Sequence, residues 1–200
     1  MGTIRSKIRL GKEGIMVICI DVGHLGRTGK LKWDRGAVTQ NAKEANVALL
    51  YAVIARGLLE AKGHNVYLLS YGTYSFRHTF ARKKIKPDIH VQCHLNAGKG
   101  SYSLFIHRKK DKEGKRLAEI LQSKFKVVET KLKLSKHKRK AINKGDRGYG
   151  CLMLGVPSVL FEPMFLDNPK HFNLLIKGDA ISIIGKQLAE AISQWCVTLN

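Results

Sequence analysis

The sequence has few of the features that mark disulfide-rich or membrane-spanning proteins. Its four cysteines are far apart and form no Cys-x-x-Cys pair, which argues against a disulfide framework or a zinc ribbon. No apolar run reaches the roughly 18 residues that a membrane helix needs, and the N-terminus lacks the apolar segment of a signal peptide. We therefore expect free buried thiols, synthesis in a reducing cytoplasm without a signal peptide, and no membrane span.

Acidic residues are also scarce. The 200 residues include 15 Asp and Glu against 36 Lys and Arg, and the net charge is +21. Such an excess indicates a polyanionic partner, which could be nucleic acid, an anionic membrane or an anionic cell-wall polymer. The excess is greatest between Arg108 and Arg147, where 16 Lys or Arg stand against 5 acids. Charge indicates the class of partner but not the chemistry.

Apolar runs and amphipathic segments alternate along the chain. The runs predict buried strands at residues 15–20, 65–70, 88–94, 101–108 and 157–162. Apolar spacing predicts helices at residues 41–62, 74–84, 112–126 and 179–195, whereas residues 130–147 are charged and indicate no single type. After a basic leader over about residues 1–14, the pattern is typical of one α/β domain with a largely parallel sheet.

Polar side chains stand where three predicted strands end. His24, His94 and Glu162 each lie at or just past such an end, and the carboxyl ends of parallel strands share one edge of a sheet. The predicted helix that follows His24 places Glu44 on its inward face. A buried carboxylate is costly without a cation or hydrogen-bond donors. We therefore expect these four side chains to converge.

Each of these residues, taken alone, has an ordinary alternative. Glu44 could close a capping box that starts at Asn41. His24 could be a turn residue, and His94 could be a hydrogen-bonded core histidine, as we expect for His90. The glutamate before Pro163 could simply end its strand. These alternatives require four independent coincidences at one edge of the sheet.

The set has the chemistry of a metal-dependent hydrolase. Two imidazoles and a carboxylate are a frequent ligand set of catalytic zinc, whose fourth position is left to water. A further carboxylate, Glu162, could move the proton of that water to a leaving amine. A non-haem iron oxygenase can also use two histidines and a carboxylate, but it has no use for Glu162.

Four segments then occur in a fixed order: IDVGHLG at 20–26, EANVAL at 44–49, QCHLNA at 92–97 and PSVLFE at 157–162. They resemble the motifs of zinc-dependent N-acetylmuramoyl-L-alanine amidases of the amidase-3 type, found in bacterial cell-wall hydrolases and phage endolysins. The resemblance spans about residues 15–175. It departs at Val22, which replaces a proline, at Leu25, which replaces a glycine, and in lacking an acidic residue near Arg27. Leu25 and Arg27 could reshape the rim of the substrate site.

The resemblance implies a mixed sheet of about six strands flanked by helices. It implies one zinc ion held by His24, Glu44 and His94, with Glu162 as the catalytic glutamate. Its reaction is hydrolysis of the amide between N-acetylmuramic acid and L-alanine in peptidoglycan. Asn96 is a candidate substrate-binding residue, with a turn in the loop as its ordinary alternative.

Partner and location follow from the same resemblance. We expect residues 1–200 to form one catalytic domain without a separate wall-binding domain, so that the basic segment 108–147 attracts anionic wall polymers. A wall enzyme without a signal peptide fits a phage endolysin, made in the host cytoplasm and acting on the wall after release. The alternative from another class is a basic nucleic-acid-binding protein without catalysis.

Overall fold

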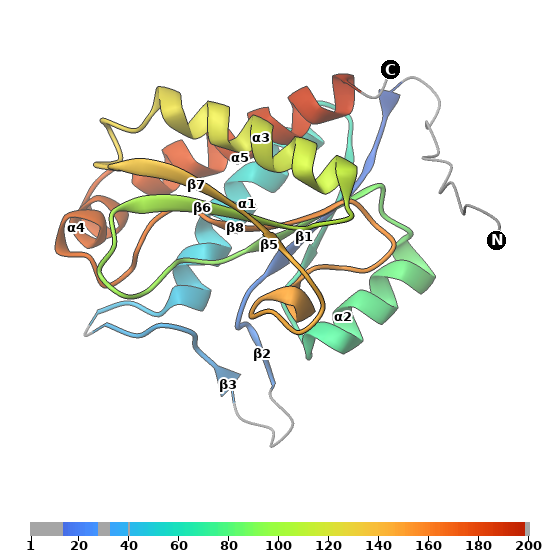
Figure 1. Ribbon diagram of the computed structural model, residues 1–200, viewed down its shortest axis with the longest axis horizontal. Coiled ribbons are helices and arrows are strands. Elements are labelled where there is room, and N and C mark those ends of the chain that lie inside the picture. The colour runs from blue at the N-terminus through green and yellow to red at the C-terminus, as the bar shows by residue number, and fades with distance from the viewer. Residues whose placement is uncertain (1–13, 28–32, 40, 199–200) are drawn as a thin grey trace.

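Short apolar strands build a six-stranded sheet in the order β4-β1-β5-β8-β6-β7 (Figure 1). The computed structural model describes residues 14–27, 33–39 and 41–198. The strands of this sheet are β1 (Val17–Val22), β4 (Asn65–Leu69), β5 (Ile89–Cys93), β6 (Tyr102–Arg108), β7 (Lys136–Ile142) and β8 (Ser158–Glu162). The short strands β2 (Gly26–Arg27) and β3 (Trp33–Asp34) form a separate antiparallel pair.

Five α-helices connect and cover the strands: α1 (Glu44–Glu60), α2 (Tyr74–Phe80), α3 (Lys112–Val127), α4 (Pro169–Lys177) and α5 (Ala180–Val197). A π-helical turn, η2 (Ala81–Ile85), extends α2, and a short 3₁₀ helix, η3 (Tyr149–Cys151), precedes β8. None of the helices in the described part of the chain is long and apolar enough to cross a membrane.

The predicted α/β class and the mixed, mostly parallel sheet of about six strands are confirmed. Strands β4, β1, β5 and β8 run parallel, while β6 is antiparallel to β8 and parallel to β7. The charged stretch 130–147, which indicated no single type, contains the edge strand β7. Helix α4 was not predicted at all. The predicted basic leader lies almost entirely outside the described residues.

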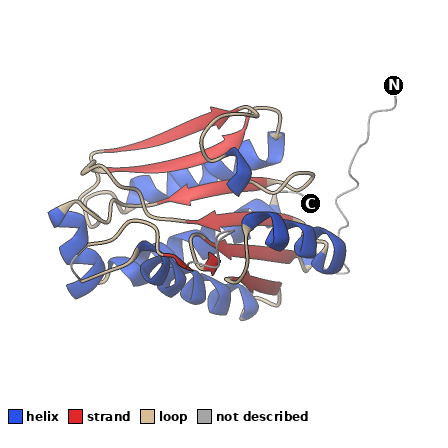
Figure 2. Ribbon diagram, turned by 90° about the horizontal axis from the view of Figure 1, so that it is seen from below, coloured by secondary structure: helices blue, strands red, loops and turns tan. Residues whose placement is uncertain are grey.

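The side-chain alternation of β1 divides the interior into two regions. Ile18, Ile20 and Val22 face the main core, where α1, α3 and α5 pack, whereas Cys19 faces a smaller cluster with Ala81. Figure 1 shows α3 and α5 on one side of the sheet and α2 on the opposite side, and Figure 2 gives the view from below. Burial of each large apolar side chain in this core contributes about 1.5–3 kcal/mol.

The parallel pairing sets the position of the functional residues. Val22 is paired with Cys93, and Cys93 with Phe161, so that β1, β5 and β8 end side by side. The residues that follow these strand ends must therefore share one edge of the sheet.

Candidate metal centre

His24 is placed by a sharp turn at the end of β1. Gly23 donates its N–H to the carbonyl of Cys93 at 2.8 Å, which holds the turn against β5. His24 itself has a φ of 65°, a left-handed conformation that few residues other than glycine adopt. Its backbone N–H donates to the hydroxyl of Tyr74 at 3.2 Å. The side chain is thereby directed toward α1, with Nε2 3.2 Å from Oε1 of Glu44.

Glu44 is the first residue of α1 and is 4% exposed. The capping-box alternative is not what the structure shows, because the N-cap is Lys43 and no side chain caps the helix. Instead, Oε2 of Glu44 accepts from the backbone N–H of Ala37 at 2.8 Å, and Oε1 accepts from that of Leu95 at 3.0 Å. These donors fix a buried carboxylate between the two histidines.

His94 follows the last residue of β5 and completes the group. Its Nδ1 lies 2.9 Å from Oε1 of Glu44, and its carbonyl accepts from the hydroxyl of Tyr51 at 2.7 Å. One potential ligand atom from each of His24, Glu44 and His94 lies within 4.8 Å of the other two. The structure thus brings together the three residues that the sequence analysis expected as metal ligands.

Two glycines leave space for this group. A Cβ on Gly23 would lie 2.3 Å from Nε2 of His94, and a Cβ on Gly36 would lie 2.6 Å from Oε2 of Glu44. Gly36 also has a φ of 68°, which a larger residue adopts only with strain. Side chains at either position would occupy the space of the three-residue cluster.

The electrostatics of the cluster favour a negative Glu44. Burial alone would raise the pKa of Glu44, but hydrogen bonds from His24 and His94 outweigh it and lower the pKa. Burial opposes charge on His24 as well, yet the hydrogen bonds and charges of Glu44 and Asp34 raise its pKa to about 9. A proton on His24 therefore partly neutralises Glu44. A divalent cation would compete with that proton for the imidazole of His24 and release the proton.

Two further side chains support the histidines, and neither was predicted from the sequence. Nδ1 of His24 lies 2.8 Å from Oδ2 of Asp34, and Nε2 of His94 lies 3.4 Å from the hydroxyl of Tyr74. Asp34 reaches His24 because β3 pairs with β2, which returns the chain to the turn after β1. A carboxylate on the far nitrogen of a ligating histidine fixes its tautomer and increases its basicity.

Glu162 ends β8 beside the cluster. Burial raises the pKa of Glu162, as does the charge of Glu44, while His94, Arg147 and His24 act in the opposite direction. Glu162 therefore lies close enough to His24, Glu44 and His94 to interact electrostatically with all three. A carboxyl group with a raised pKa at such a place is suited to proton transfer.

Asn96 lies two residues beyond His94, in a loop that bridges to Phe165. Its backbone N–H donates to the carbonyl of Met164 at 2.8 Å, and its side-chain Oδ1 accepts from the backbone N–H of Ala97 at 2.9 Å. The described contacts of Asn96 thus serve the loop. Of the two residues expected at the rim, Leu25 is half-buried against the core, whereas the side chain of Arg27 lies outside the described part of the structure.

Several solved structures, among them amidases, have the same fold. The chain is similar to the CwlD amidase of Clostridioides difficile, solved in complex with the GerS lipoprotein, with a TM-score of 0.76 at 22% identity over 92% of this chain and 100% of that one. It is similar to the catalytic domain of CwlV from Paenibacillus polymyxa, with a TM-score of 0.71 at 22% identity over 90% and 98%.

A third similar structure is the catalytic domain of CD27L, an endolysin targeting Clostridioides difficile, with a TM-score of 0.68 at 20% identity over 90% of this chain and 97% of that one. At these identities the likeness shows the fold. No curated protein sequence matches the chain significantly.

The family comparison covers most of the chain. The model of the Amidase_3 family, described as N-acetylmuramoyl-L-alanine amidase, matches residues 18–194, which include the whole sheet except the first residue of β1 and all of the cluster around Glu44. The chain therefore belongs to the Amidase_3 family and is an N-acetylmuramoyl-L-alanine amidase, an amide hydrolase that acts on peptidoglycan.

Proposed function

We propose that this amidase cleaves the bond between the lactyl group of N-acetylmuramic acid and L-alanine with the help of one zinc ion, held by His24, Glu44 and His94. The observation that carries the proposal is the convergence of two imidazoles and one buried carboxylate at the carboxyl ends of neighbouring strands. The Amidase_3 family is zinc-dependent.

The residues fit such an ion. Oε1 of Glu44 lies 2.9 Å from Nδ1 of His94 and 3.2 Å from Nε2 of His24. Ligand atoms about 2.0–2.1 Å from a tetrahedral zinc are about 3.3 Å from one another, so a shift of a few tenths of an ångström suffices. When bound, a zinc ion supplies a Lewis acid and makes water a nucleophile at neutral pH.

Glu162 supplies the proton transfer in this proposal. Its carboxylate takes the proton from the attacking water, and the resulting carboxyl donates the proton to the departing nitrogen of L-alanine. Both transfers need a group that is neither always charged nor always neutral at the working pH. Burial raises the pKa of Glu162 and so brings it closer to a neutral working pH. Arg147 interacts with the charge of Glu162 and limits the shift.

The test is Glu162→Gln, with Glu60→Gln as a matched control because Glu60 is an exposed residue paired with Arg56 on α1. We expect Glu162→Gln to retain bound zinc and the fold, and to lose activity by at least about 100-fold, the lower range for a general acid-base group. Products are identified by mass analysis of digested peptidoglycan. Stem peptides with a free L-alanine amino terminus support the proposed bond, while new reducing sugars or an active Glu162→Gln enzyme contradict the proposal.

We also propose a lytic role of the endolysin type. The likeness to the catalytic domain of an endolysin supports it, although the other two structures are described as amidases without that role. The test is expression of the chain inside a susceptible bacterium, with and without permeabilisation of the membrane. Lysis that requires permeabilisation supports the proposal. Intact cells after permeabilisation, at an enzyme level that digests purified walls, contradict it.

The basic edge of the sheet is our candidate for wall attraction. In β7, the side chains of Lys136, Lys138, Arg139 and Lys140 are exposed. Lys138 lies over the ring of Tyr102, 3.7 Å from its centroid, and Arg139 pairs with Glu119 of α3 at 2.5 Å. Glu129 contacts His137 of the same strand, so two acids stand beside four cations and the strip remains positive. Such a strip attracts anionic wall polymers such as teichoic acids.

The two alternatives raised by the sequence fare differently. A basic nucleic-acid-binding protein without catalysis is inconsistent with membership of an amidase family. An iron oxygenase would use the two histidines and Glu44 but would not need Glu162. The mechanism proposed here uses all four residues, three to hold the ion and Glu162 to transfer the proton.

A further inference from the structure

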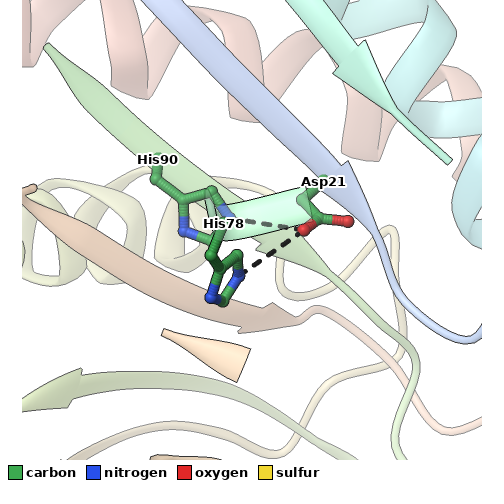
Figure 3. Close-up of side chains that lie close together, drawn as sticks. All are labelled: Asp21, His78 and His90. Atoms are coloured by element: carbon green, nitrogen blue, oxygen red, sulfur yellow. Dashed lines mark ion pairs between the residues drawn. The ribbon is translucent and has the colours of Figure 1, made fainter. Parts of the chain in front are cut away.

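A second cluster of metal-ligating residues lies on the face of the sheet that α2 covers. It consists of Asp21 of β1, His78 of α2 and His90 of β5 (Figure 3). Asp21 and His90 are fully buried, and His78 is 7% exposed. The amidase reaction described above uses none of the three. The sequence predicts His90 to be a hydrogen-bonded core histidine, and only one of its two ring nitrogens has a hydrogen-bond partner in the described structure.

The unsatisfied atoms of this cluster point at one another. Oδ2 of Asp21 lies 3.6 Å from Nε2 of His78 and 3.7 Å from Nε2 of His90, and Figure 3 shows both rings directed toward the carboxylate. These distances are too long for good hydrogen bonds. Both Nε2 atoms are buried and have no hydrogen-bond partner in the described structure. Buried polar atoms normally find partners, so two such nitrogens facing one oxygen require an explanation.

The spacing matches a metal site better than a hydrogen-bonded one. The three potential ligand atoms lie within 4.8 Å of one another. Two of their separations exceed by only 0.3–0.4 Å the distance of about 3.3 Å that separates ligand atoms around a tetrahedral zinc. The rings of His78 and His90 meet at 80° with centroids 5.1 Å apart, and each has its Nε2 as the atom nearest to Oδ2 of Asp21 in the ion pairs drawn in Figure 3.

The outer contact of His90 is of the kind that a metal-bound histidine makes. Nδ1 of His90 lies 2.7 Å from Oγ of Ser158, which also accepts from the N–H of Met153 at 3.2 Å. When Nδ1–H of His90 donates to that hydroxyl, the lone pair of Nε2 faces the cluster. Ligating histidines characteristically donate their other ring N–H in this way.

The carboxylate of Asp21 is held on its other side. Oδ1 accepts from Nη1 of Arg77 at 2.6 Å, which leaves Oδ2 available. Once the amide of Gln92 is oriented to satisfy its neighbours, its nitrogen donates to Oδ2 at 3.1 Å. A carboxylate oxygen accepts this bond and still has a second lone pair for a metal. Arg77 opposes a cation by its charge, but it also donates to the carbonyls of Val22 and Gly72, which disperse that charge.

We propose that Asp21, His78 and His90 form a second, buried site for a divalent transition metal of the zinc type, with a structural role. An ion there would join α2 to β1 and β5. Helix α2 carries Tyr74, whose hydroxyl contacts the backbone of His24 and the ring of His94. An ion at the second site would thus hold Tyr74 in place beside His24 and His94. The inference does not depend on the function proposed for the first site.

The experiment measures zinc per chain. The full chain is stripped with a chelator, loaded with Zn²⁺ alone, dialysed and analysed by elemental mass spectrometry. We expect two ions in the wild type, one in His78→Phe/His90→Phe, one in His24→Ala/His94→Ala, and none when all four changes are combined. Circular dichroism of each stripped variant reports whether it folds.

The outcomes separate the two sites. One ion in the wild type that survives His78→Phe/His90→Phe and disappears in His24→Ala/His94→Ala overturns this inference and leaves the first site standing. The opposite pattern overturns the first site alone. Two ions that both survive His78→Phe/His90→Phe also overturn the inference.

A second measurement covers the case in which His78→Phe/His90→Phe does not fold. X-ray absorption on zinc-loaded His24→Ala/His94→Ala, whose second site is intact, should show two imidazoles and one oxygen ligand at about 2.0–2.1 Å. A spectrum without imidazole scattering, or a variant that retains no zinc, contradicts the inference.

Discussion

The backbone of Gly23 lies directly against the imidazole of His94, so closely that a Cβ on Gly23 would be 2.3 Å from Nε2. The contact joins the turn after β1 to the end of β5, and it leaves the ring of His94 facing Glu44. A glycine is needed here because of the neighbouring ring, and the φ of Gly23 is not in the left-handed region.

The first prediction concerns this contact. In Gly23→Ala, the new methyl group displaces the ring of His94 from Glu44, so we expect affinity for zinc at the first site to fall by at least about 10-fold, the scale seen when a ligand loses its support. Competition with a chelating dye measures the affinity. Gly57→Ala is the control, because nothing lies within 4 Å of a Cβ there and α1 should gain about 0.5–1 kcal/mol. Equal zinc affinity in Gly23→Ala and wild type would show that the ring has room to move.

The second prediction concerns Asp34. Asp34→Ala removes the carboxylate 2.8 Å from Nδ1 of His24, so the imidazole loses the partner that fixes its tautomer. We expect zinc affinity to fall by about 10- to 100-fold while the fold is retained. Asp146→Ala, at an exposed turn that contacts Asn143, serves as the control for loss of one acid. An unchanged affinity in Asp34→Ala would mean that Asp34 has no part in metal binding.

The third prediction is a pH dependence of stability that arises from His171. Nδ1 of His171 accepts from the N–H of Phe165 at 3.0 Å, and Nε2–H donates to the carbonyl of Lys133 at 3.3 Å, so the folded protein needs a neutral ring. Burial lowers the pKa of His171, against the effect of its bond to Lys133.

Because the folded-state pKa lies below 6.5, the unfolded chain binds the proton first as the pH falls. The contribution of His171 to the free energy of unfolding is complete above about pH 6.5 and decreases below it. His171→Asn keeps an acceptor near Nδ1 and does not titrate. Urea unfolding of both proteins at several pH values should show a smaller acid-side loss in His171→Asn, and identical slopes would exclude the effect.

The fourth prediction tests the positive strip on β7. Neutralising Lys136, Lys138, Arg139 and Lys140 to Gln should weaken binding to walls that carry anionic polymers and reduce its salt dependence. Co-sedimentation is measured between about 0.1 M and 1 M salt, where the Debye length shortens from about 10 Å to about 3 Å.

A charge-matched control neutralises four exposed lysines outside β7: Lys83, Lys84, Lys177 and Lys186. If both variants lose binding equally, net charge is responsible and β7 has no special role. Wall binding that does not respond to salt in any of the proteins would remove the electrostatic explanation altogether.

Much of the candidate metal centre was predictable because each of its three residues obeys a short-range rule. His24 and His94 follow apolar runs, and parallel pairing places the ends of such runs at one edge. Glu44 stands on the apolar stripe of its helix, which indicates burial without a structure. These rules depend on periodicity and chain direction, and both can be read from sequence.

The remaining features depend on contacts that periodicity does not encode. Asp34 reaches His24 through the pairing of two-residue strands, which are too short to leave a pattern. Strand β7 is mostly charged and exposed, so it lacks the apolar run or alternation that marks a strand. Asp21 and His78 come together only because α2 folds across β1, a tertiary contact between residues 57 positions apart.

The exposed lysines of β7 also affect how copies of this protein meet. As the last strand of the sheet in the described part of the chain, β7 has one edge that pairs with no further strand, although the carbonyl of His137 accepts from the side chain of Gln122. In a neutral strand such an edge is a template for pairing with another chain. Four cations along seven residues make two such edges repel one another. The same side chains therefore protect the protein from edge-to-edge aggregation while it remains free in solution.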